Sequence, residues 1–168
     1  MKILLLVPSL NAGGVETGTI DLSVSLAKKG HTVIVVSSGG ELVSELRKNT
    51  IYHIQLPVHK KSFMTFLQVF LLANIIRQEQ IDIVHAQSRV PAWVAYFACK
   101  ITRTPLVTSC HGYYSRHFFS TIMGWGEKVI VISKVIAEHM HDAFGVPEEK
   151  IRLVYRGVDL SRYTYRPD

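Results

Sequence analysis

The sequence predicts an α/β fold of the Rossmann type, in which helices cover both faces of a largely parallel, seven-stranded sheet. Short apolar runs rich in β-branched residues alternate with longer segments of helical period along almost the whole chain. Of the residues, 48% are hydrophobic and 19% are charged, which is typical of a folded domain and excludes a disordered chain. The 168 residues have the length of one large domain, and no linker, repeat or low-complexity run divides them.

The β-branched runs define the strands, and the segments between them define the helices. Strands are expected at 2–7, 31–37, 51–56, 82–86, 105–110, 128–132 and 151–154. Helices are expected at 15–29, 41–48, 62–79, 91–101 and 133–144. The final residues, "YRGVDLSRYTYRPD", start no convincing element, so we expect the chain to lead into a further unit there.

Charge and cysteine content narrow the classes of partner. Nineteen Lys and Arg against 13 Asp and Glu give a net charge of +6, which favours anionic partners. The basic residues are scattered and form no nucleic-acid motif, so nucleic acid is not an expected partner. The two cysteines, Cys99 and Cys110, form no CxxC pair and have no metal-ligand spacing, which favours a reducing cytoplasm and no metal cofactor.

Two hydrophobic segments, the N-terminus and residues 63–76, could act as targeting or membrane elements. The N-terminus lacks the pattern of a signal peptide. The longest apolar stretch, 63–76, contains Gln68 and Asn74 and is shorter than the roughly 20 residues that span a bilayer. The sequence therefore predicts no transmembrane segment.

The glycine-rich segment "PSLNAGGVETG", residues 8–18, joins the first expected strand to the first expected helix. In an open parallel sheet, ligands bind outside the carboxyl ends of the strands. Gly13 and Gly14 lack Cβ atoms, so the backbone there can adopt positive φ and admit a ligand closely. The helix that follows offers free N–H groups to an anion. The loop therefore predicts a phosphate or carboxylate site, with a tight turn of no other function as the alternative.

A dehydrogenase-like dinucleotide site is disfavoured. The glycines do not match G-x-G-x-x-G, and no Walker lysine follows them. The second strand ends in "SSGG", where such a site would have an acidic ribose ligand.

Three more polar positions fall at the same edge of the expected sheet. His85 ends the fourth strand, His111 and Gly112 follow the fifth, and Ser133 follows the sixth. Histidines at two successive carboxyl ends, beside an anion-binding loop, indicate a functional site. His85 could instead cap its strand and hydrogen-bond a neighbouring loop, and Ser133 could be the N-cap of the next helix.

Taken together, these segments resemble the amino-terminal half of a retaining glycosyltransferase of family 4, which has two Rossmann-like domains. Seven segments carry the resemblance in order, and they are "NAGGVE", "GHTVIVVSSGG", "LPVHKKS", "DIVHAQSRVPAW", "VTSCHGYY", "VIVISKVIAEHM" and "VYRGVDLSRY". The "SRVPAW" and "RGVD" variants are similar to those of a bacterial subgroup that assembles lipopolysaccharide or other surface glycans.

The resemblance implies transfer of a sugar from a nucleotide-sugar donor to a glycan or glycolipid acceptor, with retention of configuration and without a metal. It places Gly13 and Gly14 against the donor phosphates or the acceptor, and His111 at the donor sugar as the catalytic residue. Gly112 would keep the backbone close to the ligand. Glu16 follows the glycines as the pattern expects, whereas Thr17 stands where similar sequences often have Arg.

The family binds most of the nucleotide through a second Rossmann-like domain with basic residues and an E-x7-E motif. That motif does not occur here, because Glu148 and Glu149 are adjacent. Residues 1–168 are therefore expected to be the amino-terminal, acceptor-side domain, inactive alone and partnered by a carboxyl-terminal domain absent from this chain. The alternative is a non-catalytic module that binds a nucleotide or an anionic glycan.

Two further segments have features of acceptor or membrane contacts. In "VHKKSFMTFLQVFLLANII", residues 58–76, Lys60 and Lys61 precede an apolar helix that is expected to be buried in the core, with insertion into a membrane as the alternative. The lysines could still contact anionic lipid at the inner face of the cell membrane. In "HGYYSRHFFSTIMGW", residues 111–125, Tyr113 and Arg116 are expected to line the acceptor side of the cleft in a loop or short helix.

Overall fold

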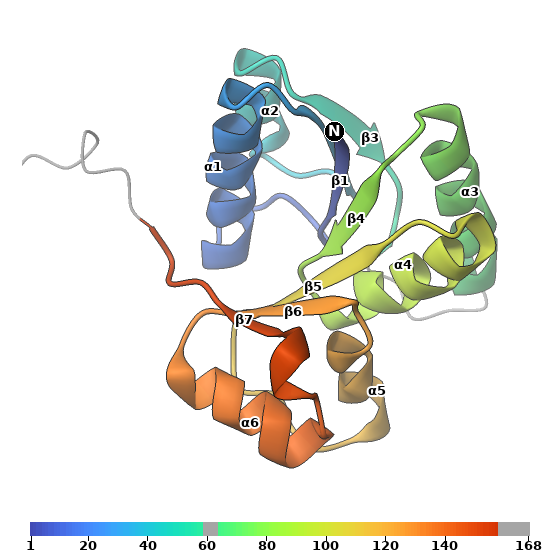
Figure 1. The fold of residues 1–168 in the computed structure, drawn as a ribbon. Coiled ribbons are helices and arrows are strands. Elements are labelled where there is room, and N and C mark those ends of the chain that lie inside the picture. The colour runs from blue at the N-terminus through green and yellow to red at the C-terminus, as the bar shows by residue number, and fades with distance from the viewer. Residues whose placement is uncertain (59–63, 158–168) are drawn as a thin grey trace, which may run out of the picture.

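The computed structural model describes residues 1–58 and 64–157, which form one seven-stranded sheet with helices on both faces (Figure 1). All strands are parallel and lie in the order β3-β2-β1-β4-β5-β6-β7. Their bounds are Lys2–Leu6, Thr32–Ser37, Tyr52–Gln55, Ile83–Ala86, Leu106–Cys110, Lys128–Val131 and Ile151–Leu153 for β1 to β7. The predicted fold class and all seven predicted strands are confirmed.

The five predicted helices are also present, and one short helix is added. The five are α1 (Gly14–Lys28), α2 (Val43–Lys48), α3 (Met64–Gln78), α4 (Arg89–Thr102) and α6 (Lys134–Phe144). A short helix α5 (Phe118–Thr121) continues into a 3-10 turn η1 (Ile122–Gly124), and a second 3-10 turn η2 (Glu148–Lys150) precedes β7. Helix α5 lies in the segment for which the sequence left a loop or a short helix open.

The helices form two layers because side chains of a strand alternate between the two faces of the sheet. From β1, Leu5 packs in the cluster beneath α1 and α2, while Leu4 and Leu6 pack in the larger cluster beneath α3, α4 and α6. Parallel connections of the usual right-handed sense place α1 and α2 on one face and the later helices on the other. The connections after β1 and β4 therefore diverge at the carboxyl edge of the sheet, which is where open α/β sheets bind ligands.

Helix α3 is only half buried, which corrects the expectation of a helix inside the core. Its inner side is buried through Leu72, Ala73 and Ile76, while Phe66 and Phe70 are exposed on its outer side. The helix belongs to a single outer layer, and no described element covers its outer side. Lys60 and Lys61 lie outside the described residues.

Candidate functional site

The first loop is braced by the "SSGG" segment at the end of β2. The N–H of Leu10 donates to the carbonyl of Gly39 at 2.8 Å, and the N–H of Ala12 donates to Oε1 of Glu41 at 2.9 Å. Gly40 has φ of +142°, and a Cβ there would lie 2.4 Å from the carbonyl carbon of Leu10. The two glycines after β2 thus let the second loop pack directly against the first and fix its shape.

The glycines of the first loop do not act through positive φ, which corrects one expectation. Gly13 is the N-cap of α1 with φ of −178° and ψ of 163°, an extended conformation open to any residue. A Cβ at Gly13 would instead lie 2.3 Å from a carboxylate oxygen of Glu16, which folds back over the start of the helix. Gly13 therefore makes room for the Glu16 side chain.

The other two glycines of α1 make room for Arg156. After β7 the chain crosses toward α1 (Figure 1), and Arg156 donates a hydrogen bond to the carbonyl of Gly14. A Cβ at Gly14 would lie 3.1 Å from Nη1 of Arg156, and a Cβ at Gly18 would lie 2.9 Å from Nη2. Nη2 also lies 3.3 Å from Oγ1 of Thr17. A guanidinium therefore stands beside Thr17, although position 17 itself carries no charge.

Arg156 is the site residue that the sequence analysis did not identify. Its segment, "RGVD", contributes to the family resemblance but predicts no role for the arginine. The local pattern contains no signal for its position, because the contact with α1 depends on β7 ending at the far side of the sheet and on the direction that the chain takes afterwards.

His111 follows β5 and lies half-buried at the carboxyl edge. Its Nε2 is buried and has no hydrogen-bond partner among the described residues. Burial lowers the pKa of His111 first, and the positive charge of Arg156 lowers it further, while Glu16 acts in the opposite direction. Glu16, His111 and Arg156 thus share one electrostatic environment, and the His111 ring is neutral at physiological pH.

Tyr114 lies close to the turn that carries His111. Burial first, and Cys110 second, raise the Tyr114 pKa to about 12, while the nearby His111 backbone and Arg89 act in the opposite direction. The guanidinium of Arg89, at the start of α4, lies 5.1 Å from the centre of the Tyr114 ring. The Tyr114 carbonyl also lies 2.7 Å from Nε2 of His139, so Tyr114 joins the segment after β5 to α4 and α6.

His85 lies deeper than His111 and has a partner. Its Nε2 is 2.6 Å from Oγ of Ser109 on β5, and both side chains are buried. Burial first, and His111 second, lower the His85 pKa to about 4, so its ring is neutral. Of the two alternatives for His85, this geometry favours a supporting residue between β4 and β5.

Gln87, which the sequence analysis passed over, is buried next to His85 on the same side of the sheet. Its Oε1 accepts a hydrogen bond from Oγ1 of Thr19 on α1 at 3.2 Å, and its Nε2 has no partner among the described residues. The signal that could have found it is a polar side chain directly after a buried strand. Gln87 Nε2 is therefore a second buried nitrogen, besides His111 Nε2, that has no hydrogen-bond partner among the described residues near the carboxyl edge of the sheet.

Three of the remaining predicted residues are Ser133, Gly112 and Tyr113. Oγ of Ser133 accepts a hydrogen bond from the N–H of Ile136 at 3.3 Å, as an N-cap does. A Cβ at Gly112 would meet nothing within 4 Å, so the described residues give no steric reason for a glycine there. Tyr113 stacks on the ring of His139 of α6 with the ring centres 3.6 Å apart.

The aromatic segment after His111, which is predicted to line the acceptor side of the cleft, extends from the turn after β5 onto helix α4. The rings of Phe118 and Phe119 pack on Trp93 of α4, with ring centres 5.5 and 6.4 Å away, and thus extend the outer helical layer. Arg116 is exposed and has no contact with the first loop or with His111 in the part of the chain that the structure describes. Only Tyr113 and Tyr114 of this segment lie close to the carboxyl edge of the sheet.

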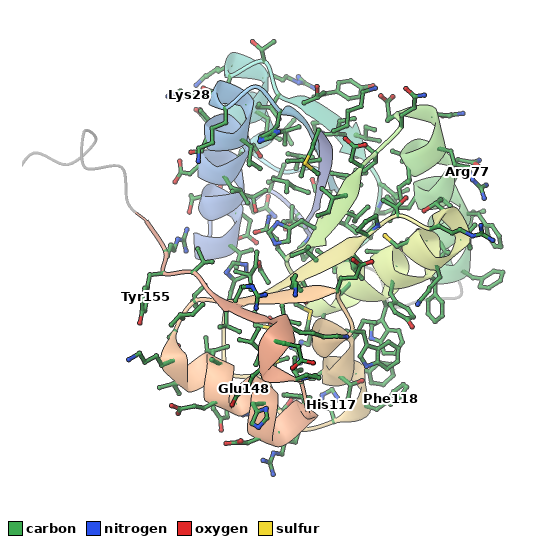
Figure 2. The ribbon with its side chains drawn as sticks, viewed as in Figure 1. Lys28, Arg77, His117, Phe118, Glu148 and Tyr155 are labelled. Atoms are coloured by element: carbon green, nitrogen blue, oxygen red, sulfur yellow. The ribbon has the colours of Figure 1, made fainter. Side chains whose placement is uncertain are left out.

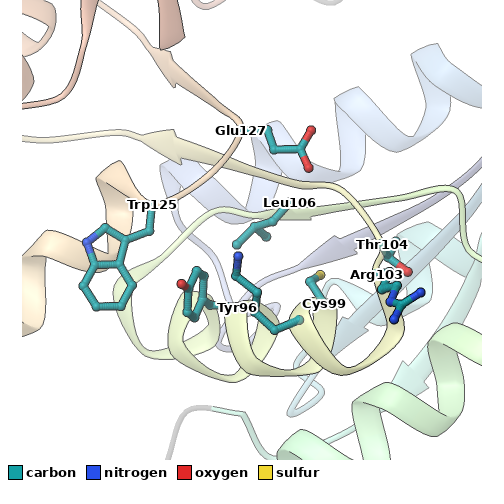
Figure 3. Close-up of a pocket in the computed structure, with 8 residues that line it drawn as sticks. Tyr96, Cys99, Arg103, Thr104, Leu106, Trp125 and Glu127 are labelled. Atoms are coloured by element: carbon teal, nitrogen blue, oxygen red, sulfur yellow. The ribbon is translucent and has the colours of Figure 1, made fainter.

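A separate pocket of about 240 Å³ lies at the opposite end of β5 (Figure 3). Tyr96, Cys99, Arg103 and Glu127 line it, beside Leu106 at the first position of the strand. Because ligands of this architecture bind at the carboxyl ends of strands, this pocket does not belong to the candidate site. Within residues 1–58 and 64–157, no cluster of three His, Cys, Asp or Glu side chains could hold a metal ion.

Comparisons with known proteins agree with this arrangement. The sequence model of glycosyltransferase family 4 matches residues 12–162. An uncharacterised glycosyltransferase of Methanocaldococcus jannaschii is 24% identical over 90% of this chain and 44% of its own length. A crystal structure of a glycosyltransferase from Rickettsia africae has 37% identity and a TM-score of 0.85, over 95% of this chain and 44% of that one.

The fold is shared with a further solved structure. HepE of Anabaena, crystallised with UDP-glucose, has 22% identity and a TM-score of 0.82, over 99% of this chain and 47% of its own. The chain thus spans less than half the length of these relatives. The family model covers most of the sequence, and the structure has the parallel sheet that carries the first loop and His111. The chain therefore belongs to glycosyltransferase family 4.

Proposed function

We propose that this chain forms the acceptor-side half of a retaining glycosyltransferase, which transfers a sugar from a nucleotide-sugar donor to a glycan or glycolipid acceptor. The observation that carries the proposal is the neutral His111, whose buried and unpaired Nε2 shares an edge with Arg156 and the start of α1. A neutral imidazole nitrogen can donate a hydrogen bond to, or accept one from, a sugar hydroxyl. The binding of UDP-glucose by HepE, which has the same fold, supports a donor of this class.

Arg156 and the first turn of α1 are proposed to bind the donor diphosphate. The positive end of the helix dipole lies at Gly14, where the first N–H groups have no acceptor within the helix. A guanidinium beside this positive end adds to the local positive charge, of which the Glu16 carboxylate balances a part, and so favours an anion there. Arg156 can form the paired hydrogen bonds that suit phosphate oxygens.

Transfer with retention needs fixed charges more than a pair of acids. In the proposed reaction the bond between the anomeric carbon and the diphosphate oxygen breaks, and the acceptor oxygen bonds to that carbon on the same face. The leaving diphosphate takes the proton of the acceptor hydroxyl. Arg156 and the first turn of α1 stabilise the negative charge that develops on the leaving group. His111 orients the sugar, and Glu16, which lies against Gly13 at the start of α1, is proposed to line the acceptor side of the cleft.

The second wall of the site is proposed to come from a second Rossmann-like domain that carries the E-x7-E motif and most contacts to the nucleotide. The chain spans less than half the length of the relatives it matches, which supports this view. We place the reaction in the cytoplasm, where the two buried and unpaired cysteines stay reduced. The acceptor is proposed to be a growing lipopolysaccharide or another surface glycan, as the "SRVPAW" and "RGVD" segments suggest.

The test uses the polypeptide encoded by the complete reading frame and a panel of nucleotide-sugars with a lipid-linked glycan acceptor. NMR spectroscopy of the product should show the same anomeric configuration as the donor, and inversion would exclude the proposed mechanism. Residues 1–168 alone should bind the same nucleotide-sugars weakly or not at all in calorimetric titrations. Submicromolar binding by residues 1–168, without transfer by the longer chain, would instead favour a non-catalytic binding module.

A further inference from the structure

The outer surface of α3, α4 and α5 exposes large apolar side chains. Phe66 is 67% exposed on α3, Phe97 is 47% exposed on α4, and Phe118 is 65% exposed on α5. Single exposed apolar residues are common on soluble proteins, but a contiguous group indicates an interaction surface. We refer to this group as the aromatic face, and it consists of Phe66, Leu67, Phe70, Leu71, Trp93, Phe97, Ile101, Phe118, Phe119 and Trp125.

Ring contacts join the α4 and α5 parts of the aromatic face. Trp93 lies at the centre, with its ring 6.1 Å from Phe97, 5.5 Å from Phe118 and 5.2 Å from Trp125. These distances are those of interacting aromatic pairs. The rings are thus held in place by one another, and they remain open to solvent on the outer side.

A groove between α3 and α4 connects the α3 part of the aromatic face to the α4 part. It has a volume of about 450 Å³ and is lined by Phe66, Val69, Phe70, Phe97 and Ile101, with Lys100 as its charged residue. Phe66 and Phe70 also contact each other, with ring centres 5.1 Å apart. The aromatic face therefore runs without interruption from α3 across α4 to α5.

The charges around the aromatic face are almost all positive. Neither α3 nor α4 contains an Asp or Glu, and residues 64–126 hold five Lys and Arg against two Asp and Glu. Lys100 lies in the groove with its ammonium 5.4 Å from the centre of the Tyr96 ring, and Arg77 reaches the carbonyl of Ile101 at 3.4 Å. Figure 2 shows Arg77, His117 and Phe118 on the same side of the molecule, across from Lys28 on α1.

From this combination we propose that the aromatic face binds the surface of an anionic membrane. Aromatic and aliphatic side chains surrounded by cations are suited to the headgroup region, where the rings enter the lipid boundary and the cations meet lipid phosphates. A second copy of this chain fits less well as the partner. In a symmetric contact the cations beside the aromatic face of one copy, such as Lys100 and Arg77, would face the same cations of the other copy and repel them. Among the described residues no helix could cross a bilayer, so the contact is peripheral.

The orientation of the aromatic face relative to the candidate site is compatible with a membrane-bound acceptor. Helix α4 begins shortly after the carboxyl end of β4, so Trp93, near the start of this helix, lies toward the edge of the sheet that carries His111. The membrane inference does not depend on the proposed transfer reaction, since it rests only on exposed side chains and charge.

The proposal is tested with residues 1–168 and vesicles of two compositions, phosphatidylcholine alone and phosphatidylcholine with about one third phosphatidylglycerol. Trp93 and Trp125 are the only tryptophans of the chain, so a blue shift of their emission reports directly on the aromatic face. We expect binding to the anionic vesicles to be at least about tenfold tighter than to the neutral ones, and to weaken at high salt. Co-sedimentation gives the bound fraction independently.

Two variants and two matched controls assign the binding surface. Replacing Phe66, Phe70 and Phe97 with Ser, or Lys100 and Arg103 with Glu, should each reduce anionic-vesicle binding at least about tenfold. Lys28→Glu with Lys29→Glu on α1 makes the same charge change elsewhere, and Tyr52→Ser with Val135→Ser removes exposed apolar side chains elsewhere. Both controls should bind as the unaltered chain does. Phe66→Ser alone is used if the triple variant does not show the circular dichroism of the folded chain.

Three results would overturn the assignment. They are the absence of binding to anionic vesicles, equal losses in the variants and their controls, and unchanged binding when the aromatic face is altered. Analytical ultracentrifugation is run in parallel. A dimer that the triple Phe variant dissociates, without vesicle binding by the unaltered chain, would assign the aromatic face to contacts between copies of this chain.

Discussion

The guanidinium of Arg156 lies 3.3 Å from the hydroxyl of Thr17, which precedes it by 139 residues. The same group donates a hydrogen bond to the carbonyl of Gly14 and is one cause of the lowered pKa of His111. A cation is thus placed at the positive end of a helix, next to a histidine that it helps to keep neutral. This contact between the two ends of the described chain suggests the first two predictions.

Arg156→Ala should raise the KM for the nucleotide-sugar about tenfold or more in the complete enzyme, because one charge-assisted contact to the diphosphate is lost. The free energy of unfolding should not decrease, since a positive charge is removed from the positive end of α1. Steady-state kinetics and urea denaturation measure the two effects. Arg152→Ala is the control, because within the described part of the chain the Arg152 guanidinium bonds to the nearby carbonyls of Glu149 and Ile151. An unchanged KM in Arg156→Ala would exclude a role for Arg156 in donor binding.

Gly18→Ala should separate stability from donor binding. Alanine is favoured over glycine inside a helix by up to about 1 kcal/mol, so the free energy of unfolding should rise or stay constant. The new Cβ would lie 2.9 Å from Nη2 of Arg156, however, so the guanidinium must move. We expect the KM for the donor to increase while the urea midpoint does not fall. A variant that loses stability and affinity together would show that Gly18 serves the helix itself.

His111→Ala should lower kcat by on the order of a hundredfold with a smaller effect on the KM for the donor. Burial and Arg156 hold the His111 pKa below its usual range, so the ring loses its neutral form only in acid. The acidic limb of the pH profile for kcat should therefore lie below pH 6.5, the ordinary histidine value. Arg156→Ala should move this limb toward higher pH, and a limb that stays in place would contradict the coupling.

His85 should make the fold sensitive to acid. Above pH 6.5 its ring is neutral in both the folded and the unfolded chain. Between pH 6.5 and about 4, only the unfolded chain binds the proton, so the free energy of unfolding falls as the pH falls. The total loss from this group is on the order of 3 kcal/mol and is complete below about pH 4.

His85→Gln tests this linkage, because glutamine keeps a side-chain amide to bond Ser109 but does not titrate. Urea denaturation at a series of pH values should give a shallower dependence in the variant than in the unaltered chain. Equal slopes would show that other groups, such as His53 and His111 with their lowered pKa values, account for the acid sensitivity.

Gly40→Ala should destabilise the chain by about 2 kcal/mol or more, because its φ of +142° suits glycine and the Cβ would strike the backbone of Leu10. Gly30 offers the matched comparison, since its φ is +85° and a Cβ there meets nothing within 4 Å. Gly30→Ala should cost only about 1 kcal/mol from the left-handed conformation. Similar losses in the two variants would mean that the second loop does not brace the first.

The strands and long helices could be predicted because their signals are local. The run 32–37 is apolar and β-branched, and the last predicted helix ends at a glycine that adopts positive φ, Gly145. Helix α5 has only four residues, Phe118–Thr121, and so it has no period that a sequence pattern could detect. The outer side of α3 was assigned to the core because apolar residues on all sides of a helix usually indicate burial.

The candidate site could be predicted only in part. The first loop and His111 each stand directly after a strand, so the topology of a parallel sheet was enough to bring them to one edge. The contact of Arg156 with Gly14 and the burial of His85 against Ser109 depend on how separate elements pack, which no local pattern encodes. The role of the glycines also changed, from admitting a ligand to admitting the side chains of Glu16 and Arg156.

The space beside Gly14 and Gly18 holds one guanidinium, and this has an evolutionary consequence. The family resemblance implies that Arg often stands in the place of Thr17, and a side chain of that kind would reach the space that Arg156 fills here. Positions 17 and 156 should therefore covary among homologues, with a long cation at one and a small or neutral residue at the other. An alignment in which arginine is common at both positions together would show that the two cations do not substitute for each other.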